Sequence, residues 1–158
     1  MHRGVVNGGA SLVLNHLHHR HAPIYHLCQA LEEQLYSFAS ANSYLSPGGG
    51  SRGYEPHYDG HDILVLHLEG EKTWTVCNDI HSVDMHQRKL NGGKGIFKMG
   101  DDFGECTKII FKPGDVLYAP MGTIHYAEAV NSQQRNFPQE YSLHLTISLD
   151  RQNFSWGK

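Results

Sequence analysis

The sequence contains few cysteines and no long apolar run. Its 158 residues include three cysteines (Cys28, Cys77 and Cys106), an odd number without CxxC spacing, so we expect reduced thiols and no disulfide framework. No apolar stretch approaches the roughly 20 residues that a membrane helix needs, and the first residues have too short an apolar core for a secretory signal. We therefore expect an intracellular protein with no membrane contact.

An excess of basic residues is also absent. Thirteen lysines and arginines stand against sixteen acidic residues, for a net charge of −3, so the composition does not indicate phosphate-driven binding to nucleic acid. The length predicts one domain spanning residues 1–158. Histidine, in contrast, is abundant, with thirteen copies. Because histidine is the commonest metal ligand, this abundance favours a metal site without locating it.

Short β-rich runs separated by glycine and proline predict a mainly β fold. Tight turns such as EGEK and KPGD favour an antiparallel sandwich or barrel of the jelly-roll and cupin kind. The segment from Asp84 to Glu105 lacks periodicity, so we expect a surface insertion there. The runs expected to form strands are 10–15, 43–46, 62–70, 72–77, 107–112, 115–120 and 141–149.

One amphipathic helix is expected beside this β structure. From Pro23 to Phe38, apolar residues recur at steps of three and four, with polar residues between them and the proline in the first turn. The preceding histidine-rich stretch HLHHRH, His16 to His21, could bind a metal, but its mixture with Arg20 favours a solvated loop.

Two histidines and one aspartate are the strongest candidate for a metal site. His57 and Asp59, in the stretch PHYDGHD, lie on one face of an extended segment with Cα atoms roughly 6.5 Å apart. His61 shares that face, but its Cα is roughly 13 Å from that of His57, too far for a compact site. The best third ligand is His125, which follows two turns in KPGDVLYAPMGTIH, and the rival His144 is better placed beside the site. Two histidines and a carboxylate are typical of non-haem Fe(II) oxygenases, although zinc and manganese fit the same ligands.

Three stretches taken together resemble a known family. PHYDGHDILVLHLEGEKTW, FKPGDVLYAPMGTIHYAEA and YSLHLTIS resemble the JmjC-domain 2-oxoglutarate oxygenases, and within them the ribosomal oxygenase group. The likeness extends from Gly9 to Ser148 and implies a double-stranded β-helix, the jelly roll of cupins, with one flanking helix. The chain then corresponds to a single catalytic core, or to a fragment that lacks the outer N-terminal strands and the C-terminal dimerisation region of its relatives.

The resemblance implies the cofactors and the residues that bind them. Lys72 is expected to bind the distal carboxylate of the cosubstrate 2-oxoglutarate, and a lysine beside Trp74 in a buried strand does need an anionic partner. Tyr44 is expected to contact the same cosubstrate, with Asn42 and Thr146 beside it. O2 is the second cosubstrate. The residues expected to hold Fe(II) are His57, Asp59 and His125.

The reaction implied by the resemblance is hydroxylation of a protein side chain, namely a histidyl or arginyl residue of a ribosomal protein. The alternatives are N-methyl-lysine demethylation of a histone by the same chemistry, a non-catalytic cupin-type binding protein, and a metal-dependent isomerase or hydrolase. The relatives also imply a homodimer, a nuclear or nucleolar location and a role in chromatin regulation. Met121 stands where many relatives have arginine, and Gly60-His61 replaces a more acidic pair. Because neither change removes a metal ligand or Lys72, we expect catalysis to be retained.

Overall fold

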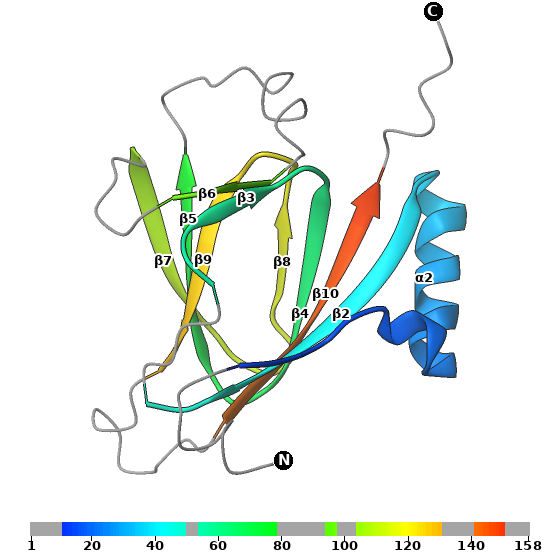
Figure 1. Ribbon diagram of the computed structural model, residues 1–158, viewed down its shortest axis with the longest axis horizontal. Coiled ribbons are helices and arrows are strands. Elements are labelled where there is room, and N and C mark those ends of the chain that lie inside the picture. Colours follow the sequence, from blue (N-terminus) through cyan, green and yellow to red (C-terminus); the bar gives the residue numbers. More distant parts are fainter. Residues whose placement is uncertain (1–10, 50–53, 79–93, 98–103, 131–140, 151–158) are drawn as a thin grey trace, which may run out of the picture.

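The computed structural model describes residues 11–49, 54–78, 94–97, 104–130 and 141–150, which form two facing antiparallel sheets (Figure 1). Sheet A has the strand order β1 (Leu12–Leu14), β2 (Phe38–Pro47), β10 (Tyr141–Asp150), β4 (Asp62–Glu69), β8 (Val116–Ala119). Sheet B has the order β6 (Lys94–Ile96), β3 (His57–Asp59), β9 (Ile124–Ala129), β5 (Lys72–Asn78), β7 (Glu105–Phe111). Apart from β1 and β2, strands that pair are not consecutive in the sequence, as in a jelly roll, and the expected mainly β fold is confirmed.

The expected helix is present as α2 (Ala22–Leu35), on the outer side of sheet A (Figure 1). It begins with Pro23 in the first turn, where the missing amide hydrogen has no helical partner to lose. The prediction that the helix continues to Phe38 is wrong, because Tyr36 takes a left-handed conformation (φ 49°) that ends the helix, and Phe38 already begins β2. Among the described residues, no helix combines the length and the apolar character needed to span a membrane.

Part of the expected surface insertion is a strand. Residues 94–96 form β6, which pairs with β3 so that Ile96 lies opposite His57. The interpretation of 84–105 as irregular throughout is therefore wrong for these residues. Three residues, Lys-Gly-Ile, are too few to show an alternation of their own, so only the pairing with β3 identifies them as a strand. Residues 84–93 and 98–103 lie outside the described residues.

The expectation of reduced thiols is wrong for two of the three cysteines. Cys77 on β5 and Cys106 on β7 lie directly opposite each other in the antiparallel register and form a disulfide, with their Cα atoms 4.0 Å apart. They are 29 residues apart in sequence, and no short spacing pattern predicts that they pair. Cys28 on α2 is a buried free thiol, as expected.

The hydrophobic core is divided by the alternation of side chains along the strands. On β10, Leu145, Ile147 and Leu149 face outward and pack with α2, because successive residues of a strand point to opposite faces. A second apolar cluster fills one side of the space between the sheets. The remaining inner surface, bordered by β2, β10, β3 and β9, carries polar side chains and forms a pocket. The second cluster consists of Ile63, Val65, Trp74, Phe111 and Ala119.

Candidate metal centre and its pocket

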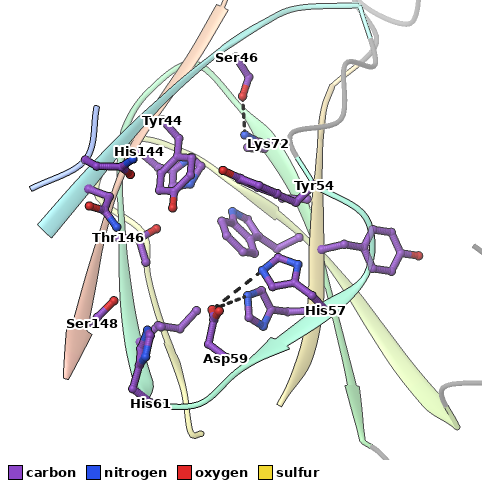
Figure 2. Close-up of a pocket in the computed structure, with 17 residues that line it drawn as sticks. Tyr44, Ser46, Tyr54, His57, Asp59, His61, Lys72, His144, Thr146 and Ser148 are labelled. Atoms are coloured by element: carbon purple, nitrogen blue, oxygen red, sulfur yellow. Dashed lines mark hydrogen bonds and ion pairs between the residues drawn. The ribbon is translucent and has the colours of Figure 1, made fainter. Parts of the chain in front are cut away.

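The pocket lies between the two sheets and has a volume of about 320 Å³, within the range of small-molecule sites. Strands β2 and β10 of sheet A form one wall, and strands β3, β5 and β9 of sheet B form the other. Figure 2 shows Ser46 and Lys72 at one end, Asp59 and His61 at the other, and Tyr44 and Tyr54 between the two ends. The two ends of the pocket therefore differ in chemistry, with a lysine at one end and a carboxylate at the other.

The three residues expected to hold a metal converge at one end of this pocket. His57 and Asp59 come from β3, and the sheet register places His57 directly opposite His125 on β9. The Oδ2 atom of Asp59 lies 3.9 Å from Nε2 of His57 and 3.6 Å from Nε2 of His125. These separations are too long for hydrogen bonds, but they suit donors that share one ion at about 2.1 Å each.

Backbone carbonyls fix the orientation and the tautomer of both histidines. Nδ1 of His57 lies 2.8 Å from the carbonyl oxygen of Glu55, and Nδ1 of His125 lies 2.9 Å from that of Thr123. Because a carbonyl oxygen only accepts, each Nδ1 must carry the proton and donate it. Each Nε2 then presents its lone pair toward Asp59, which is the usual arrangement of histidines that bind a metal.

The chemistry of this donor set fits a transition-metal ion. Two neutral imidazoles and one carboxylate supply three ligands, and the pocket side of the group is left for further ligands. A hard ion such as Ca²⁺ prefers six to eight oxygen ligands and is a poor match. His61 lies in the turn between β3 and β4 and lines the pocket without joining the group of three, in agreement with the distance argument from the sequence.

Asp62 holds the loop that leads to His125. Its Oδ1 accepts a hydrogen bond from the backbone amide of Met121 (2.8 Å), and its Oδ2 accepts one from the hydroxyl of Tyr118 (2.8 Å). The backbone amide of Gly122 also donates to the carbonyl of Asp59 (2.9 Å). The sequence predicts only that Asp62 begins a strand, because its partners are more than fifty residues away.

Lys72 is buried at the opposite end of the pocket, with 2% of its surface exposed. Its Nζ donates a hydrogen bond to Oγ of Ser46 (2.7 Å), and no carboxylate of a described residue pairs with it. Burial lowers the pKa of Lys72 from 10.5 to about 8. A buried ammonium with a single neutral partner is costly, so this end of the pocket favours an anion.

Aromatic rings line the middle of the pocket. The rings of Tyr44 and His144 stack with their centroids 4.8 Å apart and their planes 4° from parallel. Burial first, then the neighbouring Tyr54 and Asp59, raise the pKa of Tyr44 to about 12. Burial first, then Lys72, lower the pKa of His144 well below its usual value, so His144 is neutral. His144 therefore adds no charge to this wall.

Two buried nitrogen atoms of the wall have no hydrogen-bond partner among the described residues. They are Nδ1 of His144 and Nε1 of Trp74, and both side chains line the pocket. Because buried polar groups in native proteins are nearly always hydrogen-bonded, such atoms indicate a ligand or ordered water that would meet them. They are a second feature, independent of Lys72, that suits a polar ligand.

The remaining expected residues line the pocket as well. Asn42 on β2 and Thr146 on β10 are register partners, one strand step from the pair of Tyr44 and His144. The sequence analysis missed Ser46 and Ser148, which continue the same alternation along β2 and β10. Extending the period of two residues along each strand would have identified both. Tyr54 was also missed, because it follows the glycine-rich loop and belongs to no strand.

Comparison with known proteins places these observations in a family. The family model for the JmjC domain matches residues 14–155. The chain is 34% identical to ribosomal oxygenase 1 of Gallus gallus and 36% identical to ribosomal oxygenase 2 of Mus musculus, each over 85% of this chain. It is 32% identical to a bifunctional lysine-specific demethylase and histidyl-hydroxylase of Drosophila mojavensis over 80% of this chain. These matches cover 20%, 26% and 13% of the relatives' own lengths, so the chain spans about a quarter or less of each.

Solved structures agree on the fold. A ribosomal oxygenase from Escherichia coli superposes with a TM-score of 0.60 at 22% identity, covering 88% of this chain and 31% of that one. A structure of the same enzyme in complex with cobalt and 2-oxoglutarate gives a TM-score of 0.57 at 21% identity, with the same coverage of both chains. With the family model matching nearly the whole sequence, the chain belongs to the JmjC domain family.

Proposed function

We propose that this protein is an Fe(II)- and 2-oxoglutarate-dependent dioxygenase that hydroxylates a protein side chain, a histidyl or arginyl residue of a ribosomal protein. One observation carries the proposal. A single pocket has a group of two histidines and a carboxylate at one end and a buried lysine without a carboxylate partner at the other (Figure 2). A dicarboxylate that chelates the metal with its keto-acid end would place its distal carboxylate at the lysine.

In the proposed site, His57, Asp59 and His125 hold Fe(II), and the tautomers set by Glu55 and Thr123 point both Nε2 atoms at the ion. When bound, Fe(II) with 2-oxoglutarate and O2 supplies the oxidation, in which the cosubstrate yields succinate and CO2 and one oxygen atom enters a substrate C–H bond.

The other residues of the pocket bind and orient the cosubstrate. Lys72 pairs with the distal carboxylate, and Ser46, which already accepts a hydrogen bond from Lys72, holds the ammonium in place. The unpartnered Nδ1 of His144 and Nε1 of Trp74 are available to polar atoms of the ligand. Tyr44 keeps its proton at neutral pH because its pKa is about 12, so it can donate a hydrogen bond without adding negative charge.

The charge of the pocket favours a neutral histidyl substrate over the two cationic candidates, an arginyl residue and a methylated lysine. Asp59 is the only carboxylate among the described residues that line the pocket, and the proposed metal uses it. A methylated lysine is a cation and would find no second negative charge in that lining, whereas a neutral imidazole side chain needs only hydrogen-bond partners. A hydroxyl group of that kind is present in Ser148, whereas Asn42 and Thr146 are expected to contact the cosubstrate.

The test combines a cosubstrate assay with mass spectrometry of the substrate. Incubation with Fe(II), 2-oxoglutarate and ribosomal proteins should release succinate and add one oxygen to a histidyl or arginyl residue. His57→Ala should abolish both results, whereas His26→Ala, an exposed histidine on α2, should leave them unchanged. Absence of succinate release from the intact protein would contradict the proposal and favour a cupin-type binding protein.

Demethylation is the second candidate function, because one relative is named as both a lysine-specific demethylase and a histidyl-hydroxylase. Incubation with methylated histone peptides distinguishes the two. Loss of a methyl group as formaldehyde, without oxygen gain on ribosomal proteins, would replace the hydroxylase proposal.

A nuclear or nucleolar location and a homodimeric state belong to the same proposal. Imaging of the tagged protein in its own cells tests the location, and light scattering in solution tests the oligomeric state.

A further inference from the structure

A turn outside the pocket gathers three histidines. The 3₁₀ helix η1 (Leu17–His19) lies between β1 and α2, and the side-chain donor atoms of His16, His18 and His19 lie within 4.8 Å of one another. The sequence alone favours a solvated loop here. In the structure, however, the hydrogen bond from the backbone amide of His19 to the carbonyl of His16, the residue before η1, closes a turn that brings the two histidines together.

The backbone of this turn is held in an unusual conformation. His16 has φ 54° and ψ 43°, which lie in the left-handed region that few residues other than glycine adopt. The backbone amide of His16 donates to Oδ1 of Asn42 (2.9 Å), and the amide of His19 donates to the carbonyl of His16 (3.0 Å). The first hydrogen bond fixes the turn against β2 and the second closes the turn itself, and backbone held in a rarely populated conformation is a recurrent feature of functional sites.

His18 has a structural role that separates it from the other two histidines. Strand β1 pairs with β2 only as far as Ser43, so the backbone amide of Ala41 lacks a strand partner on that side. That amide donates to Nδ1 of His18 (3.1 Å). A neutral His18 therefore carries its proton on Nε2 and has no free lone pair for a metal. Among the described residues, no hydrogen bond involves the ring of His16 or His19.

We propose that His16 and His19 form a second metal site, on the surface, for a divalent transition-metal ion such as Cu²⁺, Ni²⁺ or Zn²⁺. Imidazole suits these ions, whereas Ca²⁺ and Mg²⁺ require oxygen ligands that the turn does not supply from these side chains. The two rings have centroids 5.9 Å apart, and both side chains are exposed, so small rotations bring their nitrogen atoms onto one ion. Water completes the coordination.

The experiment uses tag-free protein carrying His57→Ala and Asp59→Ala, which leave only one of the three pocket ligands, and counts bound Ni²⁺ by isothermal titration in a buffer that does not chelate the metal. A further substitution, His19→Ala, should remove one bound ion or lower the affinity of that site at least about tenfold, because one of two imidazoles is lost. His16→Gly should do the same while its circular dichroism stays that of the parent, since glycine favours the left-handed backbone at this position.

Two further variants make the assignment specific. His26→Gln, on the exposed side of α2, should retain the parent number of ions. His18→Ala should also retain it, because His18 binds Ala41 and not the metal. If His16→Gly and His19→Ala both titrate like the parent, or if His18→Ala alone removes the ion, the proposed ligand pair is wrong.

Discussion

The two faces of strand β10 have opposite characters. On the outer face, Leu145, Ile147 and Leu149 are almost fully buried against α2 and its neighbours. On the inner face, His144, Thr146 and Ser148 line the pocket, and one nitrogen atom of His144 lacks a partner among the described residues.

The difference shows that one face of β10 contributes to stability and the other to the chemistry of the pocket, because successive side chains of a strand point to opposite faces. Substitutions on the outer face should alter folding, and substitutions around the pocket should alter binding and turnover. Four experiments test whether the two faces are independent.

The largest expected effect is on the pocket side. Asp59→Ala removes the only carboxylate of the proposed metal site, so turnover should fall at least about a thousandfold, equivalent to roughly 4 kcal/mol of transition-state stabilisation. Succinate release measures turnover. A melting curve of the same variant separates a loss of chemistry from a loss of fold, because Asp59 lines the pocket and belongs to none of the apolar core clusters. Turnover close to that of the parent would place the metal elsewhere.

The next effect is on the outer face. Ile147 is 1% exposed and packs in the cluster with α2, so Ile147→Ala should lower the free energy of unfolding by about 2–5 kcal/mol. Denaturant titration measures the loss. The affinity of the folded fraction for 2-oxoglutarate should be unchanged. If the alanine variant does not fold, Ile147→Val can be measured in its place, with an expected loss of about 0.5–1.5 kcal/mol in the free energy of unfolding. A large change in affinity with either variant would show that the two faces are coupled.

Lys72→Met should move stability and binding in opposite directions. Burial lowers the pKa of Lys72 from 10.5 to about 8, which corresponds to a destabilisation on the order of 3 kcal/mol at neutral pH. Methionine removes the buried charge, so the free energy of unfolding should rise while binding of 2-oxoglutarate is lost. Lys112→Met, at an exposed lysine, is the matched control and should change neither. If the Lys72→Met protein is less stable than the parent, interactions of the ammonium in the fold outweigh the cost of burying its charge.

The smallest effect is a dependence on pH. The folded-state pKa of Lys72 lies below its unfolded value, so the folded protein binds fewer protons between about pH 8 and 10.5, and its free energy of unfolding should rise with pH across that window. Binding of a carboxylate requires the protonated lysine, so the affinity for 2-oxoglutarate should fall about tenfold per pH unit above about 8. Calorimetry at pH 7, 8 and 9 measures this trend. A constant affinity over this range would exclude Lys72 as the anion partner.

Much of the candidate site could be predicted because its signals are local. His57 and Asp59 are two residues apart on one strand, and the distance argument that sets His61 aside needs only the rise of an extended chain. Thr146, one strand step from His144, lines the pocket, and so does Tyr44, which the family resemblance implied. Lys72, in contrast, was implied by the family resemblance, because the local pattern by itself is typical of an exposed lysine at a hairpin turn.

Other features could not be predicted because they depend on which strands become neighbours. The pairing of β5 with β7 places Cys77 opposite Cys106, and the approach of β2 to β5 gives Lys72 its partner Ser46. The hydrogen bond from Ala41 to His18 arises because β1 ends early. None of these pairs has a sequence spacing that distinguishes it from chance.

Local sequence was enough to predict the alternation of β10, the amphipathic helix, and the histidine and aspartate of β3, because each depends on the geometry of one continuous segment. The tertiary structure alone decided that His125 lies opposite His57, that Lys72 faces the same pocket, and that His16 and His19 share one face of a turn fixed to β2. The physical reason is that hydrogen bonds between strands join residues far apart in the chain, and the register of those bonds is set by the packing of both sheets.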